Sequence, residues 1–119
     1  MTTQQTAKLA IQLTKENGGA TILRNGLEAS QGFAVGGVME FSYYEPELSP
    51  EYIKGYILDA VDCIKNGTAC DAFGFWMDGK TLYIDAVNIF DDEAEALAFA
   101  RKNNELAIYN ITKQQEVRC

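Results

Sequence analysis

The stretch 72–90 constrains the fold of this chain more than any other, because it predicts two β-strands folded back on each other. Asp78-Gly79 separates two apolar arms, and this dipeptide suits a two-residue hairpin turn whose central positions both take positive φ. We therefore expect a hairpin at the centre of the fold, with its turn centred on Asp78-Gly79.

Side chains alternate between the two faces of each arm of this hairpin. On the first arm, one face holds Phe73, Phe75 and Met77, and the other holds Ala72, Gly74 and Trp76. On the second arm, one face holds Leu82, Ile84 and Ala86, and the other holds Tyr83, Asp85, Val87 and Ile89. Both faces are largely apolar, so we expect helices on one face, and a second layer or an open surface on the other.

Three helices are predicted from hydrophobic periodicity and from their end signals. The first spans residues 6–16 and stops at Asn17-Gly18-Gly19. The second has Ser49 as its N-cap and Pro50 at its first helical position. Its apolar stripe comprises Ile53, Tyr56, Ile57, Ala60, Val61 and Ile64. The third covers residues 94–100, with Asp91 or Asp92 as its cap.

Shorter strands are predicted at 20–23, 32–43 and 106–111, with a short edge at 116–118. Asn25-Gly26 is a hairpin signal after the first of these, and the polar segment that follows it can equally form a loop. Gly36-Gly37 interrupts the second and indicates a bulge, or else a close approach of another backbone or a ligand. The order α-β-β-α-β-β-α-β predicts one α+β domain, residues 1–119, with a mainly antiparallel sheet.

Composition excludes several classes of protein. A chain of 119 residues with 47% hydrophobic residues is long enough for one core. The N-terminus has no basic region followed by an apolar segment, and no apolar run could span a bilayer, so we expect a cytoplasmic protein. The three cysteines have no metal-type spacing and fit reduced thiols.

The net charge of −7 is concentrated in the middle of the chain. Residues 45–95 hold twelve acidic residues against three lysines, for a formal charge of −9. Such a field repels phosphate backbones and attracts a basic protein surface. We therefore expect no direct binding of nucleic acid. The alternative is that these charges only keep the protein soluble.

The sequence contains no histidine, which excludes Ser-His and Cys-His nucleophile pairs and imidazole metal ligands. No metal or cofactor is expected. Asp78 and Asp85 could in principle form an acid–base pair. The simpler interpretation is that Asp78 serves the turn and that Asp85 lies at a rim of the sheet or bonds a neighbouring loop.

The candidate binding residues form three groups. Trp76 and Tyr83 make an aromatic patch near Asp85 if their face of the hairpin is uncovered. Arg24, at a hairpin tip, could hold a phosphate or a carboxylate. Two tyrosines beside two acidic residues resemble a protein-binding surface, unless the tyrosines are tucked beneath the loop. These are Tyr43, Tyr44, Glu45 and Glu47.

Several short motifs resemble those of a family of small, uncharacterised proteins carried by phages, prophages and conjugative elements. They are Asn17-Gly-Gly-Ala-Thr21, Gly32-Phe-Ala-Val-Gly36, Phe75-Trp-Met-Asp-Gly79, Leu82-Tyr-Ile-Asp85, Glu95-Ala-Leu97 with Asn103-Asn104, and Leu106-Ala-Ile-Tyr109. The resemblance covers about residues 17–111 and brings no catalytic residues. It implies an accessory protein of a mobile element, and such proteins often block host defence.

The leading hypothesis is a non-enzymatic protein that antagonises a host defence protein or complex by stoichiometric binding, as anti-CRISPR proteins do. Its acidic middle would meet a basic, nucleic-acid-binding surface. A second hypothesis is a sponge for a nucleotide signal that uses Arg24, Trp76 and Tyr83, with a homodimer enclosing the ligand. A third is a hydrolase acting through Asp78 and Asp85.

Overall fold

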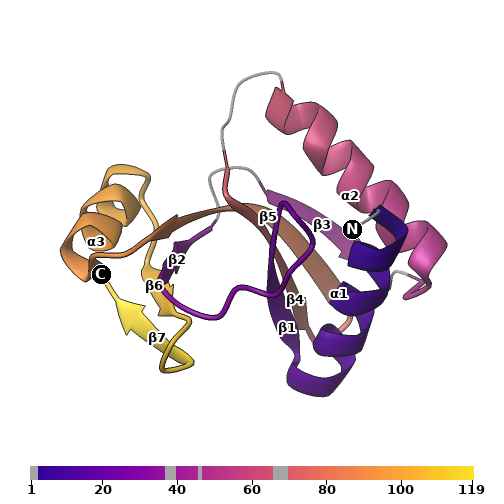
Figure 1. Ribbon diagram of the computed structural model, residues 1–119, viewed down its shortest axis with the longest axis horizontal. Helices are drawn as coiled ribbons and strands as arrows, with labels where there is room; N and C mark the ends of the chain where they lie inside the picture. Colours follow the sequence, from indigo (N-terminus) through magenta and orange to yellow (C-terminus); the bar gives the residue numbers. More distant parts are fainter. Residues whose placement is uncertain (1–2, 37–39, 46, 66–69) are drawn as a thin grey trace.

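The computed structural model describes residues 3–36, 40–45, 47–65 and 70–119 of the chain. It has an α+β fold with three helices and a seven-stranded antiparallel sheet (Figure 1). The elements are α1 Thr3–Asn17, β1 Gly19–Leu23, β2 Phe33–Val35, β3 Glu40–Tyr44, α2 Pro50–Lys65, β4 Ala72–Asp78, β5 Thr81–Phe90, α3 Glu93–Lys102, β6 Ala107–Asn110 and β7 Gln115–Arg118. The predicted fold class is confirmed, with two strands more than the predicted order.

The central hairpin is formed by β4 and β5, as predicted, but its turn lies one residue further on. Asp78 pairs with Thr81, so the two loop residues are Gly79 and Lys80, not Asp78 and Gly79. Gly79 alone takes a positive φ, 58°. This fits a turn that needs the left-handed conformation only at its first central position, where glycine adopts it at little cost.

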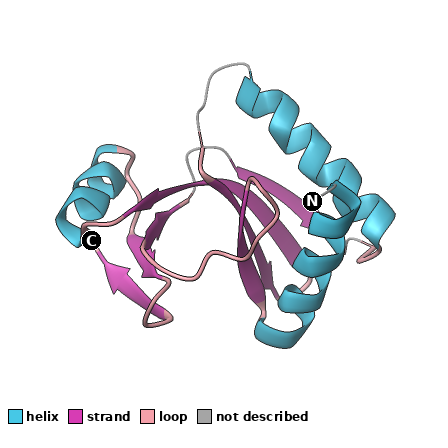
Figure 2. Cartoon of the chain, viewed as in Figure 1, coloured by secondary structure: helices cyan, strands magenta, loops and turns pink. Residues whose placement is uncertain are grey.

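The ten-residue strand β5 is shared by two parts of the sheet (Figures 1 and 2). Its first half pairs with β4 and β3, and β1 lies beyond β4; we call this the first half-sheet. Its last residues pair with β2, followed by β6 and β7; we call this the second half-sheet. The first half-sheet shares one buried core with α1 and α2, and the second shares another with α3.

Helices α1 and α2 cover one face of the first half-sheet, and the predicted hairpin face with Phe73, Phe75, Leu82 and Ile84 is buried beneath them. On α1, Ala7 and Ala10 face this core and are almost wholly inaccessible. Burial of these apolar faces stabilises both helices against the sheet.

Helix α3 packs on the second half-sheet through Ala96 and Ala100, which are fully buried against Val35 and Ile108. Small side chains let the helix approach the strands closely. The Asp92 carboxylate caps this helix by accepting a hydrogen bond from the Ala94 N–H at 3.2 Å, which confirms one of the two predicted caps.

Two sequence interpretations need correction. Ser49 precedes Pro50 as expected, but its Oγ is buried without a hydrogen-bond partner among the described residues, so it does not cap α2. The predicted strand 32–43 is two strands, β2 and β3. Four residues separate Val35 from Glu40, whereas only two separate their partners Asn88 and Asp85 on β5, so the chain cannot continue as one strand there. Gly37 lies outside the described residues.

None of the helices in the described part of the chain is long and apolar enough to cross a membrane.

Candidate functional site: an acidic groove between the half-sheets

The face of β5 that points away from α1 and α2 carries Tyr83, Asp85, Val87 and Ile89, as the alternation predicted. No helix of the described chain packs on this face. Instead it lines an open groove of about 990 Å³ that runs across both half-sheets. A small apolar cluster, which includes Ala34 and Val87, buries the middle of this face. The groove therefore lies between the two half-sheets, on the face of β5 opposite α1 and α2.

Trp76 lies on the groove wall formed by the first half-sheet, and Tyr83 lies beside it on the same face of the hairpin. They are directly paired across β4 and β5, and their ring centroids are 5.7 Å apart with an interplanar angle of 30°. Trp76 is 57% exposed. Tyr109, which is also exposed, lies on the opposite wall. Of the two alternatives for this hairpin face, the structure has the open one, with an accessible aromatic patch.

The Asp85 carboxylate lies between Gly74 of β4 and Gly36, which directly follows β2. A Cβ added at Gly74, which pairs with Asp85, would collide with its Oδ1, and one added at Gly36 would collide with its Oδ2. The close approach at Gly36 is therefore made by a side chain, rather than by the backbone or ligand that the sequence left open. Because neither position has a side chain, the carboxylate has room at the groove wall.

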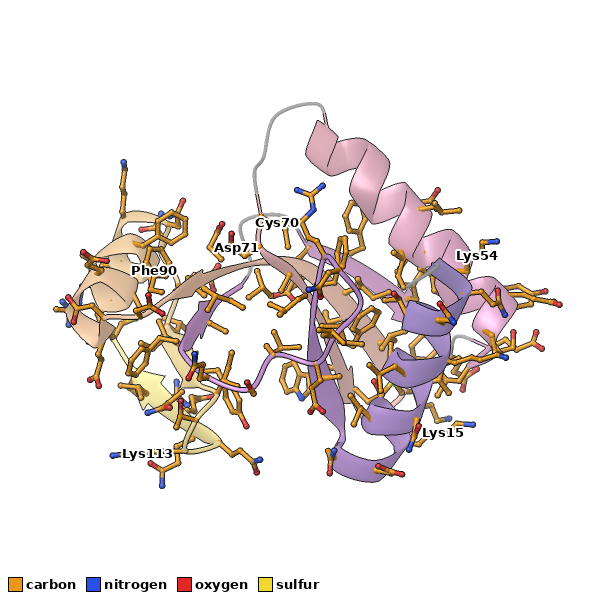
Figure 3. The ribbon with its side chains drawn as sticks, viewed as in Figure 1. Lys15, Lys54, Cys70, Asp71, Phe90 and Lys113 are labelled. Carbon is orange, nitrogen blue, oxygen red and sulfur yellow. The ribbon has the colours of Figure 1, made fainter. Side chains whose placement is uncertain are left out.

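Every charged residue among the described residues of the groove is acidic, and these residues are Glu28, Glu40, Asp85, Glu105 and Glu116. Glu116 is paired with the exposed Arg118, Nε to Oε1 at 3.0 Å. Figure 3 shows that Lys15, Lys54 and Lys113 project from the periphery of the molecule. The groove therefore combines negative charge with exposed aromatic rings.

Partial burial raises the pKa of Glu105 above its ordinary value, and the Glu40 carboxylate raises it further. Because the folded-state pKa is raised, the protonated form is favoured in the native state. Stability is therefore lost as the pH rises through the titration of Glu105.

Glu105→Gln is accordingly expected to raise the melting temperature at neutral pH and to leave it unchanged below about pH 4, where the native glutamate is already protonated. Thermal unfolding of the variant and wild type across this pH range measures the difference. Glu51→Gln, at an exposed position of α2, is the control. An equal effect of Glu105→Gln at both pH values would contradict the assignment.

The tyrosine–acid group of the sequence is divided by the fold. Tyr43 faces α2 and stacks on Tyr56, with ring centroids 3.9 Å apart, so the tucked alternative holds for this tyrosine. Tyr44 is 73% exposed on the groove side of β3. Glu45 pairs with Lys80 across the end of the hairpin at 3.0 Å. Glu47 is exposed in the following loop.

Arg24 does not join the aromatic patch. Arg24 follows Leu23, the last residue of β1, which pairs with Ala72. Its Nη1 donates a hydrogen bond to the Cys70 carbonyl oxygen at 3.4 Å. Trp76 pairs with Gly19 at the other end of β1, about 16 Å away for five residues of extended strand. Burial raises the pKa of the Cys70 thiol, and the Arg24 guanidinium partly opposes this.

Asp78 and Asp85 also lie apart. Asp85 is opposite Gly74 on β4, and Gly74 lies four residues before Asp78 on that strand. Four residues of extended strand place the two acids about 13 Å apart along the sheet. This separation exceeds the about 5–9.5 Å at which paired carboxylates share acid–base work.

Within the described residues, no group of three or more cysteine, aspartate or glutamate side chains is arranged to hold a metal ion. No family model, curated protein or solved structure matches this chain.

Proposed function

We propose that this protein acts by stoichiometric binding, and that the groove receives a basic surface of a protein partner. The observation that supports this most is the composition of the groove, whose charged side chains are all carboxylates beside the exposed Trp76 and Tyr109. Carboxylates attract lysine and arginine, and an exposed indole ring accepts a cation on its face. Aromatic residues also supply much of the binding energy at protein interfaces.

The proposed setting comes from the motif resemblance described above. In that setting the protein is an accessory factor of a mobile element in the bacterial cytoplasm, and its partner is a host defence protein whose basic surface normally holds nucleic acid. An acidic groove competes for such a surface without any chemical step.

The other hypotheses gain less support from the same geometry. A nucleotide would bring phosphates into a field of carboxylates, while Arg24 lies at the far end of β1. A hydrolase acting through Asp78 and Asp85 would need the two carboxylates closer together.

Calorimetry that measures the binding of a short arginine-rich peptide at low and high salt tests the proposal. The double variant Glu40→Gln, Glu105→Gln removes two groove charges and is expected to weaken binding about tenfold at low salt, with a smaller difference at high salt.

The matched control is Glu51→Gln, Asp59→Asn, which removes two exposed charges from α2, on the other side of the sheet. Its affinity should stay close to that of the wild type. Equal weakening by both double variants would mean that only net charge matters, and absence of binding to the wild type would reject the proposal.

A further inference from the structure

The strand β3 lies at the edge of the first half-sheet, and among the described residues it pairs with β5 alone. In an antiparallel ladder, hydrogen-bonded and non-hydrogen-bonded pairs alternate. The Glu45 N–H donates to the Lys80 carbonyl oxygen at 2.7 Å, which makes the adjacent pair Tyr44–Thr81 a non-hydrogen-bonded one. By alternation, the backbone groups of Glu40, Ser42 and Tyr44 point away from β5.

These outward N–H and C=O groups make no hydrogen bond with any other element in the described part of the chain. The opposite edge of the same half-sheet is covered, because Ala29 N–H donates to Thr21 O and Leu23 N–H donates to Leu27 O. An uncovered edge is a template on which another strand can pair.

Side chains on the two faces of β3 differ in character. Glu40, Ser42 and Tyr44 are exposed on the groove side, whereas Phe41 and Tyr43 are half-buried on the helix side. A strand added at this edge would place alternate side chains beside these two rows. A basic residue would face Glu40, and apolar residues would lie next to Phe41 and Tyr43.

We infer that an extended segment of the partner, in which basic and apolar residues alternate, adds to β3 as a further strand and places its basic side chains at the acidic groove. This inference rests on the proposed function, because the expected positive charge of the segment comes from it. A second copy of the chain is a poorer occupant, because each copy carries a net charge of −7.

The test uses a synthetic peptide that alternates arginine and valine. Ser42→Pro removes one outward N–H and leaves the ladder to β5 intact, since proline is tolerated where an edge residue faces outward. Ser42→Ala keeps the N–H and is the matched control. We expect Ser42→Pro to weaken binding at least tenfold, and Ser42→Ala to bind like the wild type.

Amide hydrogen exchange on the wild-type protein gives a second measurement that does not depend on the proline variant folding. Peptide binding should slow exchange at Glu40, Ser42 and Tyr44 more than at Phe41 and Tyr43, whose amides already bond β5.

Suppose that the peptide binds the wild type, that the Glu40→Gln, Glu105→Gln variant binds it more weakly, and that exchange at these three amides does not change. This result would overturn strand addition but leave the proposed function standing. No binding by the wild type would overturn both. A dimer in sedimentation that Ser42→Pro dissociates would show that the edge takes a second copy instead.

Discussion

Gly74→Ala is expected to destabilise the fold by about 1–3 kcal/mol, the usual cost of adding a methyl group where no room exists. The new Cβ would collide with the Asp85 carboxylate and would lie 3.0 Å from Val87 Cγ2. The carboxylate cannot simply move to its other side, because Gly36 closes that side. Chemical denaturation of the variant and wild type measures the difference in the free energy of unfolding.

A matched control is available at Gly55, where an added Cβ meets no atom within 4 Å. Because Gly55 lies inside helix α2, Gly55→Ala is expected to stabilise by about 0.5–1 kcal/mol. The same chemical change should thus have opposite signs at the two sites.

A double-mutant cycle with Asp85→Ala identifies the source of the strain at Gly74. If the carboxylate causes it, Asp85→Ala should recover most of the loss, with a coupling energy of about 1 kcal/mol or more. Additive effects of the two substitutions would show that Gly74 is needed for some other reason.

The sequence predicted the hairpin and its two faces because strand alternation is a local property that tertiary contacts rarely change. The predicted turn was one residue too early. Asp78-Gly79 suits one type of two-residue turn and Gly79-Lys80 suits another, so the local sequence allows both positions. It also treated residues 32–43 as one strand, because the change of partner position along β5 has no local pattern.

For the site, the sequence identified Trp76, Tyr83 and Asp85, which share one face of one hairpin. It missed the groove carboxylates that come from separate segments, such as Glu28, Glu40 and Glu105. Each of these looks like an ordinary solvated charge in its own segment. Their convergence depends on how the two half-sheets share β5, and a single sequence does not encode that geometry in any short motif.

Trp76→Ala is expected to weaken binding of the basic partner segment by about 2 kcal/mol or more, which is roughly thirtyfold in affinity. Trp76 is the most exposed aromatic residue in the groove and lies on the same face as Asp85. The substitution removes a large apolar contact and the ring face that a guanidinium would stack on. Calorimetry with the arginine-rich peptide measures the change.

Stability should change less than binding, because an indole that is 57% exposed contributes little core burial. The stack on Tyr83 accounts for about 0.5–1.5 kcal/mol. Tyr52→Ala is the control, since Tyr52 is a similarly exposed aromatic residue on α2, away from the groove.

If Tyr52→Ala weakens binding as much as Trp76→Ala does, the partner contacts the helical side of the molecule, and the acidity of the groove has another purpose. If Trp76→Ala alone weakens binding and the difference persists at high salt, the aromatic ring contributes through packing in addition to charge. Electrostatic attraction is screened by salt, whereas apolar contact is not, so salt separates the contribution of the indole from that of the carboxylates.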